Sequence, residues 1–314
     1  MINSGDSLPG KIVVSNSQEH EYFIYMDSDI PRSTFKLRND NNVHYSCWQW
    51  LNIKDAFFGT EGISGLTPIE YRCNVVQFDL TGNVTDRIYE AEKSELASPR
   101  NSSWDDKYLL VTIQKKGNPV QYPFEGLAPM VSLVVMDLEK KEVVVKLDSV
   151  GRFPNLRIEE SPWLHEGCRF VYSIGGGTKF KLEGQEELIN PSETTEGIYL
   201  FDVLSGESKL LVPGGRSAIV SPNSDKIAYK KENSIRVLDL KTNVEKTIYK
   251  HSQKEKLLGT HWTPDGKYIY FAYTYYSGIA DVLNSNGEKL IDASTGKEKS
   301  FKGIGHGFHP YSWK

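Results

Sequence analysis

Cysteine is scarce in this chain of 314 residues, which has three. Cys47, Cys73 and Cys168 are too few for a disulfide framework, and no two of them have the C-x-x-C spacing of zinc or thioredoxin-like sites. We therefore expect small buried thiols. A Cys47–Cys73 disulfide between neighbouring strands is the alternative if the compartment is oxidising.

An excess of charge of either sign is also missing, since 37 Lys and Arg face 41 Asp and Glu for a net charge of −4. A protein that coats nucleic acid carries a basic face, so no nucleic-acid partner is expected. No stretch approaches the roughly 18 apolar residues of a membrane span. The first residues, 1–6, have neither the basic nor the apolar region of a signal peptide. The sequence as written predicts a soluble chain of unassigned compartment, periplasmic or secreted only if a leader was removed.

Helical periodicity is nearly absent. One short helix is expected near 87–97, where Glu and Lys interleave with Ile88, Ala91 and Leu96. The chain is instead rich in aromatic residues, with 17 Tyr, 13 Phe and 6 Trp, and its 26 Gly and 14 Pro are spread along its length. Abundant aromatics and evenly scattered turn residues predict an all-β protein.

A polar turn that precedes a short apolar strand recurs along the sequence. The clearest copy is Trp262-Thr263-Pro264-Asp265-Gly266-Lys267, followed by the apolar run 268–271. Similar turns occur at 221–226, 103–107 and 163–167, and a weaker one at 48–55. A fixed repeat of this kind is the first feature to resolve, because it decides the architecture.

A second signature follows each copy: a strand that ends in Asp, then a hydrophobic residue and a turn. It occurs at Asp27, Asp79, Asp137, Asp202, Asp239 and Asp292. The spacing varies from 37 residues (Asp202 to Asp239) to 65 (Asp137 to Asp202). Units of about 40–50 residues with several strands are typical of β-propeller blades. The aspartates themselves are expected to form turns, with their carboxylates accepting backbone N–H groups.

The repeats predict an all-β, six-bladed β-propeller that forms a single domain over 1–314. Both ends of the chain are expected to share one blade, because the C-terminal segment 309–314 reads as the start of a repeat that 8–14 completes. An insertion at about 175–197 lengthens the fourth unit, and the sequence leaves open whether it covers the channel. The expected blades are 8–44, 45–91, 98–150, 157–212, 216–250 and 257–304, with 305–314 closing onto the first.

The two turn signatures resemble the WD40-like (PD40-type) repeats of the TolB-like and dipeptidyl-peptidase-like propellers, over about residues 8–314. The resemblance implies a bare propeller. There is no room for the additional α/β domain of TolB, and the segment 215–219 (Gly-Arg-Ser-Ala-Ile) lacks the last glycine of the G-x-S-x-G elbow of the hydrolase relatives. It also raises the hypothesis of a subunit of an envelope or secretion assembly.

Histidines precede several of the tryptophans at which repeats begin. If the blade register is right, they lie at the mouth of the channel, where imidazoles and carboxylates can bind a ligand, hold a metal or transfer protons. Some propeller lyases that act on pectic sugars hold a metal with inner-strand histidines. The alternative is a polar channel lining in contact with water, and we expect neither a metal nor a cofactor. The candidate channel-mouth residues are His44, Arg157, Glu160, His261, His306 and His309.

No catalytic constellation is specific, so the catalytic residues stay unknown. The favoured function is a non-catalytic binding or scaffold propeller, a monomer that presents loops and a channel mouth to a protein, peptide or glycan. The alternative is a polysaccharide lyase or glycoside hydrolase with inner-strand histidines in the channel.

Overall fold

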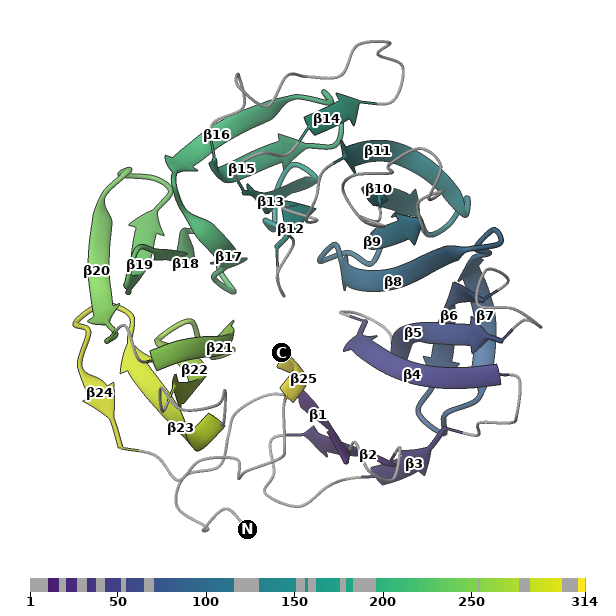
Figure 1. Cartoon of the computed structure of the whole chain (residues 1–314), viewed down its shortest axis with the longest axis horizontal. Coiled ribbons are helices and arrows are strands. Elements are labelled where there is room, and N and C mark those ends of the chain that lie inside the picture. The colour runs from purple at the N-terminus through teal and green to yellow at the C-terminus, as the bar shows by residue number, and fades with distance from the viewer. Residues whose placement is uncertain are drawn as a thin grey trace. The chain divides into compact units, whose positions relative to one another are not determined.

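The computed structural model describes most of the chain as strands joined by turns (Figure 1), and no helix occurs among the residues it describes. The chain forms two compact units, Phe35–Arg216 and Met1–Thr34 with Ser217–Lys314. The described residues are 11–16, 21–26, 33–37, 43–51, 55–64, 71–115, 130–150, 156–157, 162–175, 179–182, 196–252, 255–276, 283–300 and 310–313.

In the unit Phe35–Arg216 the strands follow one another as antiparallel meanders, β4-β5-β6-β7, β8-β9-β10-β11 and β12-β13-β15-β16. A single parallel pair, Cys73 with Leu96, joins the first two meanders through β6 and β8. The expected insertion contributes β14, which pairs with β11 and so extends a neighbouring sheet. The strands are β4 (Val43–Trp50), β5 (Ala56–Ile63), β6 (Arg72–Asp79), β7 (Val84–Tyr89), β8 (Glu95–Ser102), β9 (Tyr108–Lys115), β10 (Met130–Asp137), β11 (Glu142–Val150), β12 (Leu156–Arg157), β13 (Arg169–Ile174), β14 (Lys179–Leu182), β15 (Gly197–Asp202) and β16 (Ser208–Pro213).

The other unit holds the meanders β17-β18-β19-β20 and β21-β22-β23-β24, and a sheet of order β25-β1-β2-β3. Strands β3 and β17 cross the borders between the units. The C-terminal β25 pairs with the N-terminal β1, with Trp313 opposite Ile12, so the expected sheet shared by both ends is confirmed. The strands are β1 (Lys11–Asn16), β2 (Glu21–Met26), β3 (Ser33–Lys36), β17 (Arg216–Val220), β18 (Lys226–Lys231), β19 (Ser234–Asp239), β20 (Glu245–Lys250), β21 (Glu255–Trp262), β22 (Tyr268–Tyr276), β23 (Leu283–Asp292), β24 (Glu298–Lys299) and β25 (Pro310–Trp313).

The all-β class and the four-stranded antiparallel meander of a propeller are therefore confirmed, while the number of blades stays a prediction. The helix expected near 87–97 is wrong, because this segment holds the end of β7, a connection, and the start of β8. The Cys47–Cys73 disulfide is wrong as well. Cys73 is a free thiol that donates to the Tyr71 hydroxyl at 3.3 Å, and the register sets Cys47 opposite Gly59 but Cys73 opposite Gly62.

The repeat aspartates that the structure describes form turns as expected, whereas Asp27 lies outside the described residues. In four sheets the carboxylate accepts the N–H groups of the residues two and three positions later: the carboxylate of Asp137 those of 139 and 140, Asp202 those of 204 and 205, Asp239 those of 241 and 242, and Asp292 those of 294 and 295. The residue four positions later has a positive φ: 57° at Lys141, 72° at Gly206, 56° at Asn243 and 78° at Gly296. The glycine of the D-x-x-x-G pattern therefore occupies the position that adopts the left-handed backbone conformation.

In three repeats the first turn is held by a hydroxyl. The side chains of Ser103, Ser221 and Thr263 accept the N–H of the residue five positions later, at 2.9, 3.0 and 3.0 Å. The two kinds of turn are then tied together by backbone hydrogen bonds, such as Leu240 N–H to Asp225 and Ala293 N–H to Lys267. In these sheets the two turns therefore lie at the same end and are hydrogen-bonded to each other.

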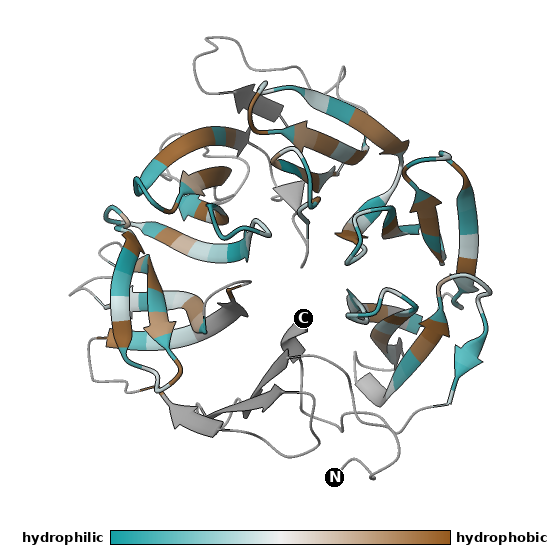
Figure 2. Cartoon of the chain, turned by 180° about the vertical axis from the view of Figure 1, so that it is seen from behind, coloured by the Kyte–Doolittle hydropathy of each residue, from teal (hydrophilic) through white to brown (hydrophobic). Residues whose placement is uncertain are grey.

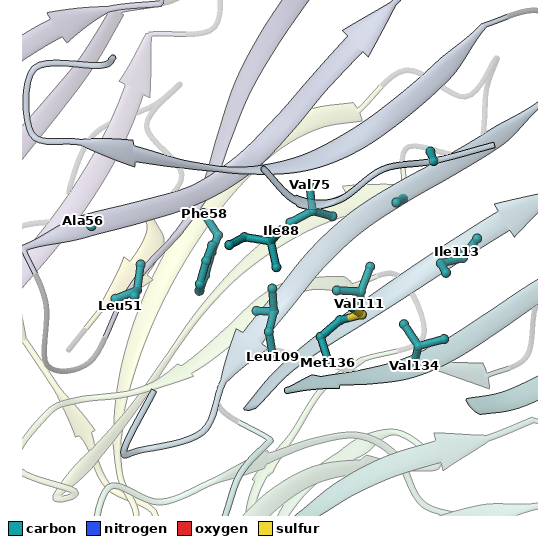
Figure 3. Packing of buried hydrophobic residues seen from close by; sticks show 12 residues of the cluster. Leu51, Ala56, Phe58, Val75, Ile88, Leu109, Val111, Ile113, Val134 and Met136 are labelled. Carbon is teal, nitrogen blue, oxygen red and sulfur yellow. The ribbon is translucent and has the colours of Figure 1, made fainter. Parts of the chain in front are cut away.

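Neighbouring sheets within a unit pack face to face, so both faces of a strand are covered. On β9, Leu109 and Val111 pack with residues of the β4–β7 sheet such as Phe58 (Figure 3), whereas Leu110 packs with Trp163 of the next sheet. Hydrophobic residues run along the strands while the turns are hydrophilic (Figure 2). This packing explains the near-continuous apolar runs in the sequence.

Tryptophans fasten one sheet to the next through their indole N–H groups. The buried Trp163 donates to the carbonyl of Asn101 on β8 at 2.9 Å, and in the other unit Trp262 donates to Ile219 on β17 at 3.2 Å. Trp104 donates to the carbonyl of Trp163 at 3.0 Å and stacks on His165, with ring centroids 3.8 Å apart. Trp163 and Trp262 therefore combine apolar burial with a hydrogen bond to a neighbouring sheet.

Replacing Asp292 by Ala is expected to lower the free energy of unfolding by about 1 kcal/mol, because the turn N–H groups lose their acceptor. Urea unfolding followed by circular dichroism measures the loss. Asp292→Asn keeps an acceptor oxygen and should cost less. An Ala variant as stable as the parent would contradict the structural function assigned to these carboxylates.

Replacing Trp163 by Phe should cost about 1–3 kcal/mol of unfolding free energy, because the carbonyl of Asn101 is left without its donor in a buried position. The matched substitution Trp104→Phe removes a similar bond from a less buried indole and should cost less. Equal losses in urea unfolding for both variants would show that the buried hydrogen bond does not carry the effect.

Candidate functional site

The described residues proposed from the sequence lie on the first strand of a four-stranded meander. We call these first strands, β4, β8, β12, β17, β21 and β25, the inner strands, after the place they have in the expected blade. His44 lies on β4, Arg157 on β12 and His261 on β21. Glu160, His306 and His309 fall outside the described residues. Because His44 and His261 belong to different units, a pocket shared by all six residues stays a prediction.

His44 and His261 do not occupy equivalent positions of the repeat. His261 is one residue from the end of β21 and pairs with Tyr270, so its counterpart on β4 is Gln49, which pairs with Phe58. His44 pairs with Gly62 at the other end of its hairpin. Five residues of strand are roughly 15 Å, so the two histidines lie toward opposite ends of their sheets. The premise that both enter the repeat at one place is wrong.

The two imidazoles also differ in their surroundings. His44 is exposed, whereas His261 is 9% exposed and lies beside Tyr270, with ring centroids 6.0 Å apart. A side chain at Gly259 would meet His261 Nε2 at 3.0 Å, so the glycine leaves room for the imidazole. Burial and a hydrogen bond to Glu288 raise the pKa of Tyr270. Of these two histidines, His44 is therefore the one that a solute can reach.

Several inner strands carry a β-bulge that the sequence did not reveal. The register shifts between Cys47 and Gln49 on β4 and between Pro99 and Asn101 on β8, which leaves Trp48 and Arg100 as the extra residues. Similar shifts occur on β21 and β25. A bulge bends the strand and turns a side chain out of the regular alternation. Arg100 is exposed, and its Nε donates to Thr112 Oγ1 at 3.0 Å.

A buried carboxylate, Glu61, lies at the end of the β4–β7 sheet where His44 is. Arg87 donates to both of its oxygens, at 2.9 and 2.8 Å, and Asn74 and Tyr45 each add a hydrogen bond at 2.9 Å. The Arg87 guanidinium, with these further donors, lowers the pKa of Glu61 to about 2 although burial opposes the shift. Glu61 is therefore an ionised acceptor that fixes β4, β5, β6 and β7 to one another.

A second buried carboxylate, Glu95, closes the connection between β7 and β8. It accepts hydrogen bonds from the Tyr89 hydroxyl and the Glu92 N–H and pairs with Lys115 at 2.7 Å. Burial would raise its pKa, but Lys115 and the Glu92 N–H hold the pKa of Glu95 below its usual value. Tyr249, Ser252 and Glu255 repeat the arrangement between β20 and β21. The Tyr-x5-Glu spacing is common to both connections, so this arrangement could have been recognised in the sequence.

Among the described residues, no group of three or more His, Cys, Asp and Glu side chains is arranged to hold a metal ion. No helix among them combines the length and the apolar character needed to cross a membrane.

No protein-family model and no curated protein match the chain. Among solved structures, a puromycin-hydrolysing peptidase of Mycobacterium tuberculosis is similar at a TM-score of 0.50 and 12% identity, over 90% of this chain and 41% of that one. An oligogalacturonate lyase from Vibrio parahaemolyticus has a TM-score of 0.47 at 12% identity, over 91% and 88% of the two chains. An oligogalacturonate lyase in complex with manganese has a TM-score of 0.46 at 12% identity, over 95% and 74%. The structural neighbours are propeller-type proteins, and at these identities the likeness concerns the fold alone.

Replacing Glu61 by Gln should make the free energy of unfolding depend less on pH in the acid range. A carboxyl whose pKa is lowered on folding adds stability above its unfolded pKa of about 4.3, and this stability is lost as the pH falls toward 2. The urea midpoint of the parent should therefore fall more steeply than that of Glu61→Gln between about pH 4.5 and 2.5. This window lies roughly between the unfolded and the folded pKa of Glu61. Glu142→Gln, on an exposed part of β11, is the control. Parallel profiles for parent and Glu61→Gln would contradict the assignment.

Proposed function

We propose that the chain is a non-catalytic binding propeller that presents loops and inner-strand side chains to a protein, peptide or glycan. The observation that carries this proposal is the difference between the two ends of the sheets. One end has short turns held by Asp, Ser and Thr side chains. In four meanders the opposite end carries a longer connection between the second and third strands: Ile63 to Arg72, Lys115 to Met130, Ile174 to Gly197 and Tyr276 to Leu283. In the β17–β20 sheet this connection is short, from Lys231 to Ser234. Binding residues are commonly found on loops that a rigid scaffold positions.

The carboxylates support the same function. The repeat aspartates are engaged in turns, and Glu61 and Glu95 are buried with Arg87 and Lys115. Their lowered pKa values keep them ionised at neutral pH, whereas a carboxyl that serves as a general acid has a raised pKa. These side chains therefore suit a scaffold.

Membership of the TolB-like, PD40-type propellers is part of the proposal, as is the closure of six blades into one ring. The T-P-D-G-K and D-x-S-T-G segments of the β21–β24 sheet support it, because each of their polar positions makes the turn hydrogen bonds that such a repeat requires. The alternative is an enzyme acting on polysaccharide, for which the exposed His44 on an inner strand is the described residue of interest.

The test is a binding screen of the full chain against peptide and glycan arrays, run together with a turnover assay on the same glycans. Saturable binding without product is the expected result. Product formation that His44→Ala abolishes, while the variant keeps its fold by circular dichroism, would establish the enzyme instead. A folded chain that binds no member of either array would contradict the proposal.

A further inference from the structure

One face of the β21–β24 sheet carries a carboxylate at a position where four other sheets have an aliphatic side chain. Four residues before its repeat aspartate, the third strand of this sheet has Glu288, which is half-buried. The residues that the register aligns with it are at most 1% exposed: Val75, Leu133, Ile198 and Ile235. A glutamate at such a position gives up apolar burial and requires hydrogen-bond partners.

A second polar group accompanies Glu288 on the same face. The hydroxyl of the buried Tyr270 donates a hydrogen bond to Glu288, and burial together with this carboxylate raises the pKa of Tyr270. The residues aligned with Tyr270 in the same four sheets carry no hydroxyl: Phe58, Leu110, Val171 and Ala228. The hydroxyl and the carboxylate therefore occur together, in one of the five sheets compared.

A third polar group on this face has its hydrogen bond unmade. Thr274 is 2% exposed, and its Oγ1 has no hydrogen-bond partner among the described residues. The register pairs Thr274 with Asn286. Glu288 is two residues further along that strand, so Thr274 and Glu288 are diagonal neighbours on one face, roughly 7–8 Å apart. Ala272, which pairs with Glu288 and lies between Tyr270 and Thr274, is half-buried. Solvent therefore reaches the sheet between these oxygen atoms.

We propose that Glu288 and Thr274 bind the ammonium group of a ligand, as a lysine side chain of a peptide presents it. This inference rests on the proposed binding function and names the group that the ligand carries. An ammonium group brings a positive charge and three N–H donors, so it satisfies a carboxylate and a threonine oxygen together, whereas a sugar hydroxyl brings one donor. Thr274 is two residues from the end of β22, where the longer connection from Tyr276 to Leu283 begins. The site therefore lies toward the end of the sheet that is proposed to bind.

The first experiment measures binding of Nα-acetyl-lysinamide to the full chain by ligand-observed saturation-transfer NMR. The neutral probe is the same compound acetylated on Nε, which has lost the charge and two of the three N–H donors. The amine should bind saturably and more weakly as salt is raised, and the acetylated probe should not bind. Glu288→Gln and Thr274→Val should each weaken binding about tenfold, as expected for the loss of a hydrogen bond to a charged group. Glu207→Gln, an equal charge change at an exposed turn residue, should stay within about twofold of the parent.

The second experiment separates a binding carboxylate from a structural one. The double variant Tyr270→Phe with Glu288→Leu removes both hydrogen-bonding partners at once and restores the apolar character of the other four sheets. Its urea midpoint should equal or exceed that of the parent, because neither partner is left unsatisfied, while amine binding is lost. The matched control is the other hydrogen-bonded pair of this kind, Tyr89→Phe with Glu95→Leu. Its midpoint should fall, because Lys115 loses the carboxylate that lies 2.7 Å away.

Three results would overturn the site. One is a urea midpoint of the Tyr270 and Glu288 variant as far below the parent as that of the control, which would make Glu288 a structural carboxylate. Another is binding of the acetylated probe as strong as that of the amine, and the third is an equal loss of binding in Glu207→Gln. If the amine does not bind but the peptide and glycan arrays yield another ligand, this inference fails and the proposed function stands.

Discussion

Leu109 and Leu110 are neighbours on β9, yet their side chains belong to two different hydrophobic clusters. Every strand in the middle of these sheets is under the same constraint, because a sheet stacked between two others has no face left for water. In a protein built this way, function is confined to the edges of the sheets and to the connections at their ends. The apolar runs that the constraint imposes leave polar chemistry to those places.

The polar groups at the two ends of the sheets have different structural functions. Aspartates and hydroxyls close the short turns, and Glu61 and Glu95 fasten the opposite end, where the chain passes from one sheet to the next. Burying a carboxylate is costly unless hydrogen bonds and a cation compensate it, and both glutamates have such partners. Their ionised state therefore stabilises the frame from which the longer connections emerge.

The features that could be predicted from sequence are local ones. The Asp turns and the Trp-bearing turns are fixed by residues within five positions of one another, so the pattern identifies them. Glu61 and Arg87 meet across three strands and are 26 positions apart, a distance at which no spacing rule applies. The helix expected near 87–97 shows the converse, since its amphipathic spacing arises from Ile88 and Ala91 packing at a sheet end.

The bulges are one reason why the candidate site was harder to place than the fold. One extra residue in an inner strand leaves the turn, the apolar run and the Asp signature intact, yet it shifts every position beyond it by one. The larger offset comes from the tryptophan itself: Trp50, not Trp48, is the counterpart of Trp262, so His44 lies six residues before its repeat tryptophan and His261 only one. Counting backward from the turn, where the backbone bond from Leu51 to Ala56 matches those of the other repeats, recovers the equivalence. Applied to every repeat, that count separates side chains that follow the regular alternation of a strand from those, such as Arg100, that sit at a bulge.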